Sequence, residues 1–375
     1  MKKVYVIAGE ASGDMHGKNL LREMKALRPD LELRGVGGDG LESVGMTLVR
    51  HIRDTNFMGF VQVIQNIWTI RNLFKQIQRD IQEWKPDVVL LIDYPGFNLR
   101  MAKFAHKLGI RVFYFISPQI WAWKKSRIKQ IRAYVDHMFP ILPFEKEFYA
   151  NEGMEVDYCG HPLLDEMKSR TYQTEDIRQG IQRQEGPTVA LLPGSRQQEV
   201  SRMLPLMLKM VDHFPDCNFV VAGSPTLEES LYQEYMAESP VPLVMGRTYD
   251  VLSLADYALV TSGTATLETA LMQVPEVVCY HANGLSVWIA RKLVKVKFIS
   301  LVNLIMDREV VRELIQQDFT ENNLVAELQK LMDPAHKRQL MADYETLRAK
   351  LGNEGASGRL AQKMVDYLHQ PRSKG

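Results

Sequence analysis

Short apolar runs alternate with longer amphipathic segments along most of the chain. Apolar strands that alternate with helices are typical of parallel sheets covered by helices on both faces. The pattern therefore predicts an α/β protein with two doubly wound parallel sheets. The predicted strands form a first series at 3–8, 32–36, 87–92, 111–116, 137–141 and 155–159, and a second series at 188–192, 218–222, 242–244, 257–260 and 276–280.

A polar, charged stretch at 165–187, which carries Gly180 and Gly186, separates the two series. The chain has 375 residues, enough for two hydrophobic cores. We therefore predict one Rossmann-like domain at 1–165 and a second at 166–345. A charged helical tail follows at 346–375, and its 358–370 segment is expected to pack back on the first domain.

The overall charge is balanced, with 46 basic and 45 acidic residues and a net charge of +1, so we expect no nucleic-acid partner. The longest apolar runs are too short for a transmembrane helix, and the run at the start breaks at Glu10, as a first strand would. The three cysteines lack a CxxC spacing and favour reduced thiols. These features predict a cytoplasmic protein.

Two loops in the second half of the chain follow apolar runs and are rich in small residues. A helix start of small residues presents backbone N–H groups that suit a phosphate. An arginine can grip a diphosphate, and a carboxylate further along the helix can accept hydrogen bonds from a ribose diol. The loops therefore predict a nucleotide-diphosphate site. Its candidate residues are Gly194, Ser195, Arg196, Ser262, Gly263, Thr264, Ala265 and Glu268.

Three loops of the first half also follow predicted strands, at 9–17, 93–98 and 117–123. Ligands of open α/β sheets bind at the carboxyl ends of the strands, so these loops are candidates for a second binding region. Asp93 follows a continuous apolar run and would place a carboxylate at that edge. The other candidates on this side are Gly9, Glu10, Ser12, Gly13, Asp14, His16 and Gln119.

Several blocks together resemble one family in order and spacing, from about residue 3 to about residue 350. They are AGEASGD at 8–14, IDYPGFN at 92–98, SPQIWAW at 117–123, LPGSR at 192–196 and SGTATLE at 262–268, with LPFE at 142–145 and GHP at 160–162. The sequence resembles the lipid-A-disaccharide synthase family of GT-B glycosyltransferases. The resemblance implies that the two Rossmann-like domains face each other across a cleft, with the acceptor on the first and the UDP-sugar on the second.

The resemblance also implies a reaction. The donor UDP-2,3-diacylglucosamine would pass its sugar to the 6-hydroxyl of 2,3-diacylglucosamine 1-phosphate, giving a β-1,6-linked disaccharide 1-phosphate and UDP. An α-linked donor and a β-linked product mean inversion at the anomeric carbon. No cofactor and no metal are expected, because Arg196 can neutralise the leaving diphosphate.

Inversion in one displacement needs a base, and Asp93 is the candidate; the alternative is a cap for the turn at Pro95 and Gly96. Arg196 could instead be a surface arginine, and the 262–265 loop an ordinary helix start. Glu268 could be a plain helix-surface residue. The family pattern suggests that Asn303 faces the donor, whereas the sequence alone suggests a loop cap.

The acylated substrates imply contact with the anionic inner membrane from its cytoplasmic side. A long amphipathic pattern at 58–84 and basic clusters at 124–129 and 291–297 suit such a surface. The alternative for the helix is burial of its apolar stripe in the core. A homodimer is left open. The membrane-facing candidates are Met58, Phe60, Val61 and Ile64.

Two other functions compete with a glycosyltransferase. A UDP-sugar 2-epimerase of the same architecture would need carboxylates around the donor ring and no acceptor pocket. A non-catalytic UDP-sugar sensor would keep Arg196 and Glu268 but would not need Asp93.

Overall fold

The structure is a computed structural model that describes residues 2–54, 67–122, 125–168, 170–181, 185–237, 239–282 and 297–371. It divides into two compact units, which are described separately. Unit 1 comprises Met1–Lys168 and Asn353–Gly375, and unit 2 comprises Ser169–Gly352. The boundary after Lys168 falls within the polar stretch at 165–187.

Unit 1 is built on a six-stranded sheet in the order β3-β2-β1-β4-β5-β6, with every neighbouring pair parallel. The central strands are continuous apolar runs because both faces of the sheet are covered. The strands are β1 (Lys2–Ala8), β2 (Leu31–Gly37), β3 (Thr47–His51), β4 (Val88–Ile92), β5 (Arg111–Phe115) and β6 (His137–Phe139).

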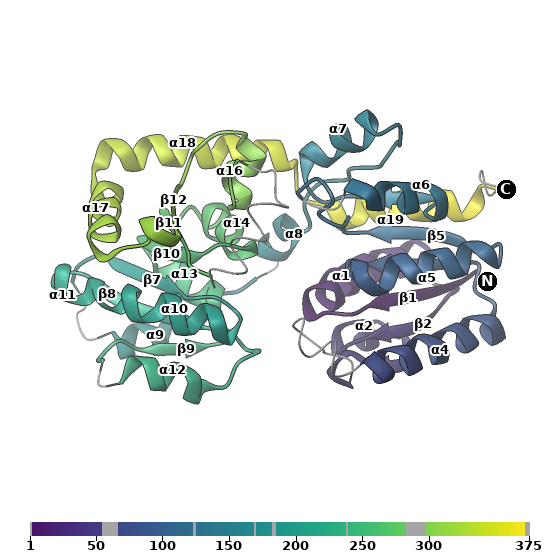
Figure 1. Ribbon diagram of the computed structural model, residues 1–375, viewed down its shortest axis with the longest axis horizontal. Coiled ribbons are helices and arrows are strands. Elements are labelled where there is room, and N and C mark those ends of the chain that lie inside the picture. Colours follow the sequence, from purple (N-terminus) through teal and green to yellow (C-terminus); the bar gives the residue numbers. More distant parts are fainter. Residues whose placement is uncertain are drawn as a thin grey trace. The chain divides into compact units, whose positions relative to one another are not determined.

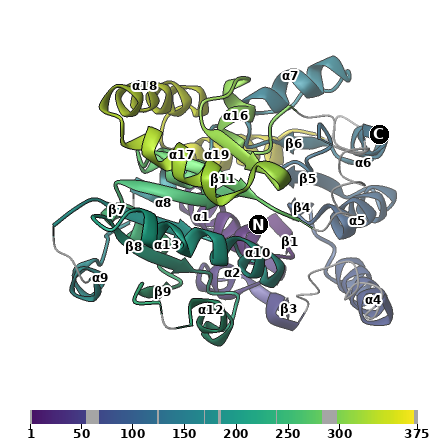
Figure 2. The ribbon, with the colours of Figure 1, turned by 60° about the vertical axis from the view of Figure 1, so that its left-hand side comes forward.

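Helices cover both faces of this sheet (Figures 1 and 2). One core cluster joins the sheet to α1, α2 and α19, and a second joins the other face to α4, α5, α6 and α7. The helices of unit 1 are α1 (Ala11–Leu27), α2 (Asp39–Ser43), α4 (Ile67–Trp84), α5 (Pro95–Lys107), α6 (Ile128–Tyr134), α7 (Pro143–Asn151), α8 (Leu163–Lys168) and α19 (Ala356–His369), with short 3-10 turns at Ile52–Asp54 and Lys125–Arg127.

Unit 2 repeats this architecture with a parallel six-stranded sheet in the order β12-β11-β10-β7-β8-β9. Its strands are β7 (Thr188–Leu192), β8 (Asn218–Gly223), β9 (Leu243–Met245), β10 (Tyr257–Thr261), β11 (Glu276–Tyr280) and β12 (Arg312–Ile315). Its helices are α9 (Glu175–Gly180), α10 (Gln197–Leu208), α11 (Met210–His213), α12 (Glu229–Met236), α13 (Thr248–Leu254), α14 (Thr264–Leu271), α16 (Leu301–Met306), α17 (Glu321–Met332) and α18 (Pro334–Leu351), with a 3-10 turn at Gln316–Asp318.

The predicted α/β class with two parallel sheets is confirmed, but three strands differ from the prediction. The segment 155–159 forms no strand, because its polar atoms make isolated bonds, such as Asp157 N–H to Met138 O, in place of a ladder. The strands β3 and β12, each at an edge of its sheet, were not predicted. Edge strands lie against the core on fewer sides, and β3 is half-exposed while β12 carries two charged residues, so neither shows a continuous apolar run.

The C-terminal helix α19 belongs to unit 1, although α18, which precedes it, belongs to unit 2. Figure 1 shows this yellow helix among the elements of the first half of the chain. Its apolar face, which includes Leu360 and Met364, is buried in the cluster that contains α1. Helix α19 therefore completes one face of the first sheet.

No helix among the described residues has the length and apolarity that a membrane crossing requires. The membrane-facing candidates Met58, Phe60, Val61 and Ile64 lie outside the described residues, as does most of the basic cluster at 291–297. The second half of the amphipathic pattern is α4, whose Ile77 and Ile81 are fully buried in the unit 1 core.

Candidate functional site

In unit 2 the two small-residue loops follow neighbouring strands. β7 and β10 pair in parallel with Leu192 opposite Val260, so both strands end at the same level of the sheet. The loops at 193–196 and 262–263 therefore lie side by side at the carboxyl edge, although some 70 residues separate them in sequence. This is the edge where α/β sheets bind ligands.

The loop after β7 is held by one carboxylate, that of Glu199 on α10. Its Oε2 accepts hydrogen bonds from the backbone N–H groups of Ser195 (3.0 Å) and Arg196 (3.2 Å). Its Oε1 accepts a bond from Arg196 Nη1 at 2.8 Å, while 71% of the Arg196 side chain stays exposed. Gly194 has φ +112° and packs against Glu199. The loop thus presents an accessible guanidinium on a fixed backbone.

The loop after β10 leaves the start of α14 open. Gly263 is the N-cap residue, so α14 has no side-chain cap, and Gly263 and Thr264 are exposed. A Cβ atom added at Gly263 would meet no described atom within 4 Å. Ser262 is anchored by its N–H to Cys279 O (3.1 Å) and by its hydroxyl to Ile299 O (3.0 Å). An exposed helix start without a side-chain cap offers N–H groups to an anion.

Glu268 and Asn303 both have partners within unit 2. The Tyr249 hydroxyl donates to Glu268 Oε1 at 2.8 Å. Asn303 is fully buried in α16, and its Oδ1 accepts bonds from the N–H groups of Val310 (2.7 Å) and Val311 (3.0 Å). Its Nδ2 donates to Val311 O and to Glu313 Oε1. These bonds fit the loop-cap alternative, and contact of Asn303 with a donor stays a prediction.

In unit 1 the loops with candidate residues follow three adjacent strands. Ala8 pairs with Ile92, and Ile92 with Phe115, so β1, β4 and β5 end at one level. The structure therefore brings Gly9 and Glu10, Asp93, and the loop of Gln119 to the same edge. Gln119 is exposed there.

Asp93 is half-buried in a turn of unusual conformation. Asp93 and Tyr94 have φ values of +47° and +48°, and two consecutive non-glycine residues in the left-handed region are costly. Burial, together with the nearby Glu10 carboxylate, raises the pKa of Asp93 to about 6, against the opposing effect of the Tyr94 N–H. A carboxylate with a raised pKa at a ligand-binding edge is suited to accept a proton.

The glycines of the first loop have packing roles. A Cβ at Gly9 would lie 2.4 Å from Cδ1 of the Tyr94 ring, so only glycine fits beside the Asp93 turn. Gly13 is buried against Ile92 and Ala8, while Ser12 is exposed at the start of α1. The loop therefore packs on the Asp93 turn and leaves Ser12 accessible.

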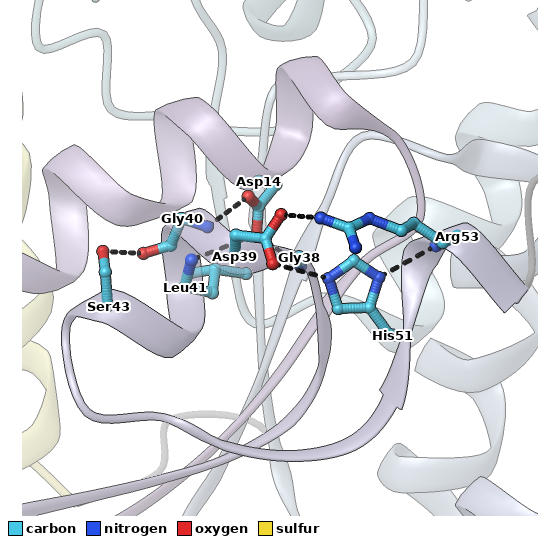
Figure 3. A network of polar contacts seen from close by, with 8 residues as sticks. All are labelled: Asp14, Gly38, Asp39, Gly40, Leu41, Ser43, His51 and Arg53. Atoms are coloured by element: carbon cyan, nitrogen blue, oxygen red, sulfur yellow. Dashed lines mark hydrogen bonds and ion pairs between the residues drawn. The ribbon is translucent and has the colours of Figure 1, made fainter.

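The Asp14 carboxylate is surrounded by backbone N–H groups, as Figure 3 shows. Its buried carboxylate accepts backbone hydrogen bonds from Gly38 (2.6 Å), Gly40 (2.9 Å) and Leu41 (3.1 Å) at the start of α2. The neighbouring Asp39 side chain is exposed; it forms a hydrogen bond with His51 and an ion pair with Arg53. Asp14 therefore ties α1 to the loop after β2, and contact of Asp14 with an acceptor stays a prediction.

His16 is buried inside unit 1, with no hydrogen-bond partner for Nδ1 among the described residues. Burial lowers its pKa to about 4. Burial, with the nearby His16, lowers the pKa of His161 to about 3, and His161 Nδ1 accepts the Leu163 N–H at 3.2 Å. Both rings are neutral at neutral pH. A solvated histidine near the start of α1 was the alternative to an acceptor-side role for His16, and the structure shows a buried ring instead.

Glu145 on α7 supports the Gln119 loop from inside. Its Oε2 accepts the Leu142 N–H at 3.0 Å, and Ser117, which starts the loop, shares a 2.7 Å hydrogen bond with the Tyr149 hydroxyl. Burial raises the pKa of Glu145 to about 7, opposed by bonds from Leu142 and Ser117. The sequence motif at 142–145 marks the position but not this contact.

Four side chains for which the sequence predicts no role hold candidate residues in place: Glu199 bonds the Arg196 loop, Tyr249 bonds Glu268, and Asn98 and Tyr114 bond the Asp93 carbonyl. Glu199 had a local signal, since a glutamate three residues after a helix start is typical of a cap. Tyr114 and Tyr249 lie on other elements, and no local pattern indicates their contacts. Within the described ranges, no three His, Cys, Asp or Glu side chains are grouped so that they could hold a metal ion.

Comparison with known proteins gives similarity over nearly the whole chain. The family described as Lipid-A-disaccharide synthetase matches residues 4–365. The lipid-A-disaccharide synthase of Syntrophus aciditrophicus (strain SB) is 40% identical over 368 residues, which cover 96% of each chain. That of Geobacter metallireducens (strain ATCC 53774 / DSM 7210 / GS-15) is 35% identical and covers 99% of this chain and 98% of its own.

Solved structures with the same fold include enzymes of two kinds. The UDP complex of S. aureus MnaA has a TM-score of 0.68 at 14% identity, with 100% of both chains covered. The UDP-GlcNAc 2-epimerase from Neisseria meningitidis bound to UDP-GlcNAc has a TM-score of 0.62 at 14% identity and covers 98% of this chain and 99% of its own. The calicheamicin glycosyltransferase CalG4 has a TM-score of 0.61 at 14% identity, with 99% of both covered. These likenesses show the shared GT-B fold.

Proposed function

We propose a specific reaction for this chain, which belongs to the lipid-A-disaccharide synthase family of glycosyltransferases in lipid A biosynthesis. The donor is UDP-2,3-diacylglucosamine and the acceptor is 2,3-diacylglucosamine 1-phosphate. The acceptor 6-hydroxyl attacks the anomeric carbon of the donor, the bond to the UDP oxygen breaks, and the hydroxyl proton passes to a base. The products are the β-1,6-linked disaccharide 1-phosphate and UDP.

The donor belongs on the carboxyl edge of unit 2. The observation that supports this is the position of two features that follow adjacent strands. One is the exposed Arg196 after β7, and the other is the exposed start of α14, without a side-chain cap, after β10. The N–H groups of α14 and the Arg196 guanidinium are suited to a diphosphate. We assign Gly194, Ser195, Ser262 and the 263–265 segment to the same donor contact. Glu268 would accept bonds from the ribose hydroxyls and Asn303 would border the donor.

The acceptor belongs on the carboxyl edge of unit 1, with Asp93 as the base. A pKa of about 6 keeps its carboxylate ionised at neutral pH and gives it more affinity for a proton than an ordinary aspartate has. Gly9, Glu10, Ser12, Gly13 and Gln119 lie around the same edge and are assigned to the acceptor side. Asp14 and His16 support this region from within α1.

Single displacement explains the proposed inversion. The hydroxyl attacks opposite the leaving UDP, so an α-linked donor gives a β-linked product. Negative charge grows on the diphosphate as its bond to the sugar breaks. The exposed guanidinium of Arg196 is suited to stabilise that charge. No cofactor takes part in this scheme.

The acyl chains of both proposed substrates place the reaction at a membrane surface. We propose peripheral attachment to the anionic cytoplasmic face of the inner membrane. The basis is the sequence: apolar positions Met58, Phe60, Val61 and Ile64 precede α4, and basic residues cluster at 124–129 and 291–297. Vesicle co-sedimentation at low and high salt tests this, and failure to bind anionic vesicles at low salt would contradict it.

The deciding experiment incubates purified protein with both acylated substrates and identifies the products by mass spectrometry. Disaccharide 1-phosphate and UDP support the proposal. An epimerised UDP-sugar without disaccharide would indicate a 2-epimerase, and UDP-sugar binding without turnover would indicate a sensor.

Two variants separate the proposed roles. Asp93→Asn should lower kcat by about 10²–10⁴-fold and leave UDP affinity unchanged. Arg196→Ala should weaken UDP binding and lower kcat by about 10²–10³-fold. Asp87→Asn, at the opposite edge of the sheet just before β4, and Arg202→Ala, further along α10, are the matched controls. Substantial activity in Asp93→Asn would remove the base role, and normal UDP affinity in Arg196→Ala would remove the diphosphate role.

A further inference from the structure

The Asp93 turn needs support from its surroundings. Asp93 and Tyr94 both adopt left-handed backbone conformations, which side-chain-bearing residues rarely take in succession. Pro95 begins α5 directly afterwards. Because an isolated turn of this kind would relax, its persistence depends on contacts that over-determine it.

Two buried side chains converge on one atom of this turn, the carbonyl oxygen of Asp93. The Tyr114 hydroxyl donates to it at 2.7 Å and Asn98 Nδ2 donates to it at 2.8 Å. Asn98 Nδ2 also lies 3.1 Å from Ile92 O, and both residues are fully buried. The Asp93 N–H donates to Phe115 O at 2.9 Å. The peptide groups on both sides of the Asp93 side chain are therefore fixed.

These supports come from different elements. Tyr114 lies on β5, the strand next to β4, and Asn98 lies in the first turn of α5. On the other side, the Tyr94 ring fills the space over Gly9 and stacks on Phe97 at 5.6 Å between ring centroids. The turn is thus clamped from β5, from α5 and from the loop after β1.

We propose that Tyr114 and Asn98 are positioning residues, which hold the Asp93 turn in its left-handed form and so aim its carboxylate at the acceptor hydroxyl. This inference rests on the proposed function, in which Asp93 is the base. Neither side chain is assigned to touch substrate. Their hydrogen bonds act on the backbone of the catalytic residue, and a displacement of about 1 Å at a reacting group can lower a rate by about 10²-fold.

We expect the hydrogen bonds from Tyr114 and Asn98, called the clamp from here on, also to limit how much water reaches the Asp93 carboxylate. The titratable groups that act on its charge are Glu10 from the loop after β1 and Tyr114 from β5, and the Tyr94 N–H is the hydrogen-bond donor beside it. If the turn relaxes, the carboxylate gains solvent and moves away from Glu10. Both changes lower the pKa of Asp93 toward the ordinary value for an aspartate.

The test compares Tyr114→Phe with Tyr5→Phe in the full-length chain. Tyr5 lies on β1 in the same core cluster and is equally buried, so its loss of a hydroxyl controls for a general effect on the core. Tyr114→Phe should lower kcat about 10-fold or more, with KM for both substrates within about twofold. The acid limb of its kcat/KM profile should shift to lower pH. Tyr5→Phe should leave these quantities close to wild type.

A double variant asks whether Tyr114 acts through Asp93. Adding Tyr114→Phe to Asp93→Asn should lower the residual turnover no further, because the carboxylate that the clamp aims is already absent. Asn98→Ala should match Tyr114→Phe in direction with a larger loss, and its folding is checked by thermal unfolding. An equal loss in both backgrounds would overturn the inference.

A second measurement does not depend on turnover. Carbon-13 NMR titration of the Asp93 carboxyl, assigned with Asp93→Asn, should give a lower pKa in Tyr114→Phe than in wild type. A wild-type protein that makes no disaccharide would refute the proposed function, and this titration would still test the clamp. An unchanged pKa, or a wild-type rate in Tyr114→Phe, would overturn the clamp even where the proposed function holds.

Discussion

At the scale of single residues, two glycines of unit 2 are required for different reasons. Gly194 has φ +112°, and a Cβ there would lie 2.6 Å from Glu199 Cβ. Gly263 has extended backbone, with φ 161°, and open space where a Cβ would be. The fold requires glycine at the first position, whereas only a ligand would require it at the second.

We predict opposite outcomes for the two alanine variants. Gly263→Ala should change the free energy of unfolding by less than about 1 kcal/mol, but weaken UDP binding about tenfold, because the methyl group occupies the approach to the α14 N–H groups. Gly194→Ala should cost about 2–4 kcal/mol through strain and overlap with Glu199. Denaturant unfolding and UDP calorimetry measure both quantities. Unchanged UDP affinity in Gly263→Ala would place the diphosphate elsewhere.

The buried histidines of unit 1 should make its stability depend on pH. The folded-state pKa of His16, about 4, lies below its unfolded value of 6.5. Between these values the unfolded chain binds a proton that the folded chain does not. Stability therefore falls as the pH falls from about 6.5 to about 4, by up to about 1.4 kcal/mol per pH unit for each histidine.

We predict that His16→Gln reduces this acid sensitivity. Asp93 and Glu145, whose pKa values are raised, act in the opposite direction, so the comparison is the difference between variant and wild type at each pH. Denaturant unfolding at pH 7 and pH 5 should show a smaller loss of stability for His16→Gln. Equal losses would mean that the ring is accessible to protons in the folded chain.

At the scale of elements, Asp14 connects α1 to the start of α2. Its carboxylate accepts three backbone N–H groups at the carboxyl end of β2 (Figure 3). A carboxylate that accepts hydrogen bonds from several buried N–H groups strongly stabilises the loop between β2 and α2. Removal of the carboxylate leaves those N–H groups without an acceptor.

We predict that Asp14→Ala lowers the free energy of unfolding of unit 1 by about 2–4 kcal/mol. Asp39→Ala, which removes the adjacent exposed carboxylate, is the control and should leave stability nearly unchanged, because its ion pair with Arg53 is exposed to solvent. Thermal unfolding followed by circular dichroism makes the comparison. Similar effects of the two variants would contradict the capping role.

At the scale of the whole molecule, unit 1 is built from two separate parts of the chain. Helix α19 packs on α1 and buries Leu360, Ala361, Met364, Val365 and Leu368. Unit 1 is therefore incomplete without α19, whereas unit 2 is continuous in sequence. Because each unit has its own hydrophobic core, we expect the two units to unfold in separable transitions.

We predict that Met364→Ala lowers the stability of unit 1 by about 2–5 kcal/mol and leaves the unit 2 transition in place. Gln362→Ala, on the exposed face of the same helix, is the control. Calorimetry of the full chain resolves the two transitions. A shift of both transitions by the same amount would show that the units unfold together.

Much of the fold could be predicted because its signals are local. The runs at 88–92 and 188–192 are apolar throughout, as strands buried on both faces are, and they are β4 and β7. The motif blocks at strand ends gave the family, which full-length similarity confirms. The edge strands β3 and β12 carry no such run, so periodicity alone could not place them.

The sequence by itself determined the two α/β units, the loops with chemical groups and the family. Only the tertiary structure decided which loops meet, because sheet order depends on packing between residues far apart in the chain. It placed β10 beside β7, and thus Gly263 beside the Arg196 loop. It also placed the Tyr114 hydroxyl on the Asp93 carbonyl. Local periodicity shows which face of an element is buried, but not the side chain of another element that it meets.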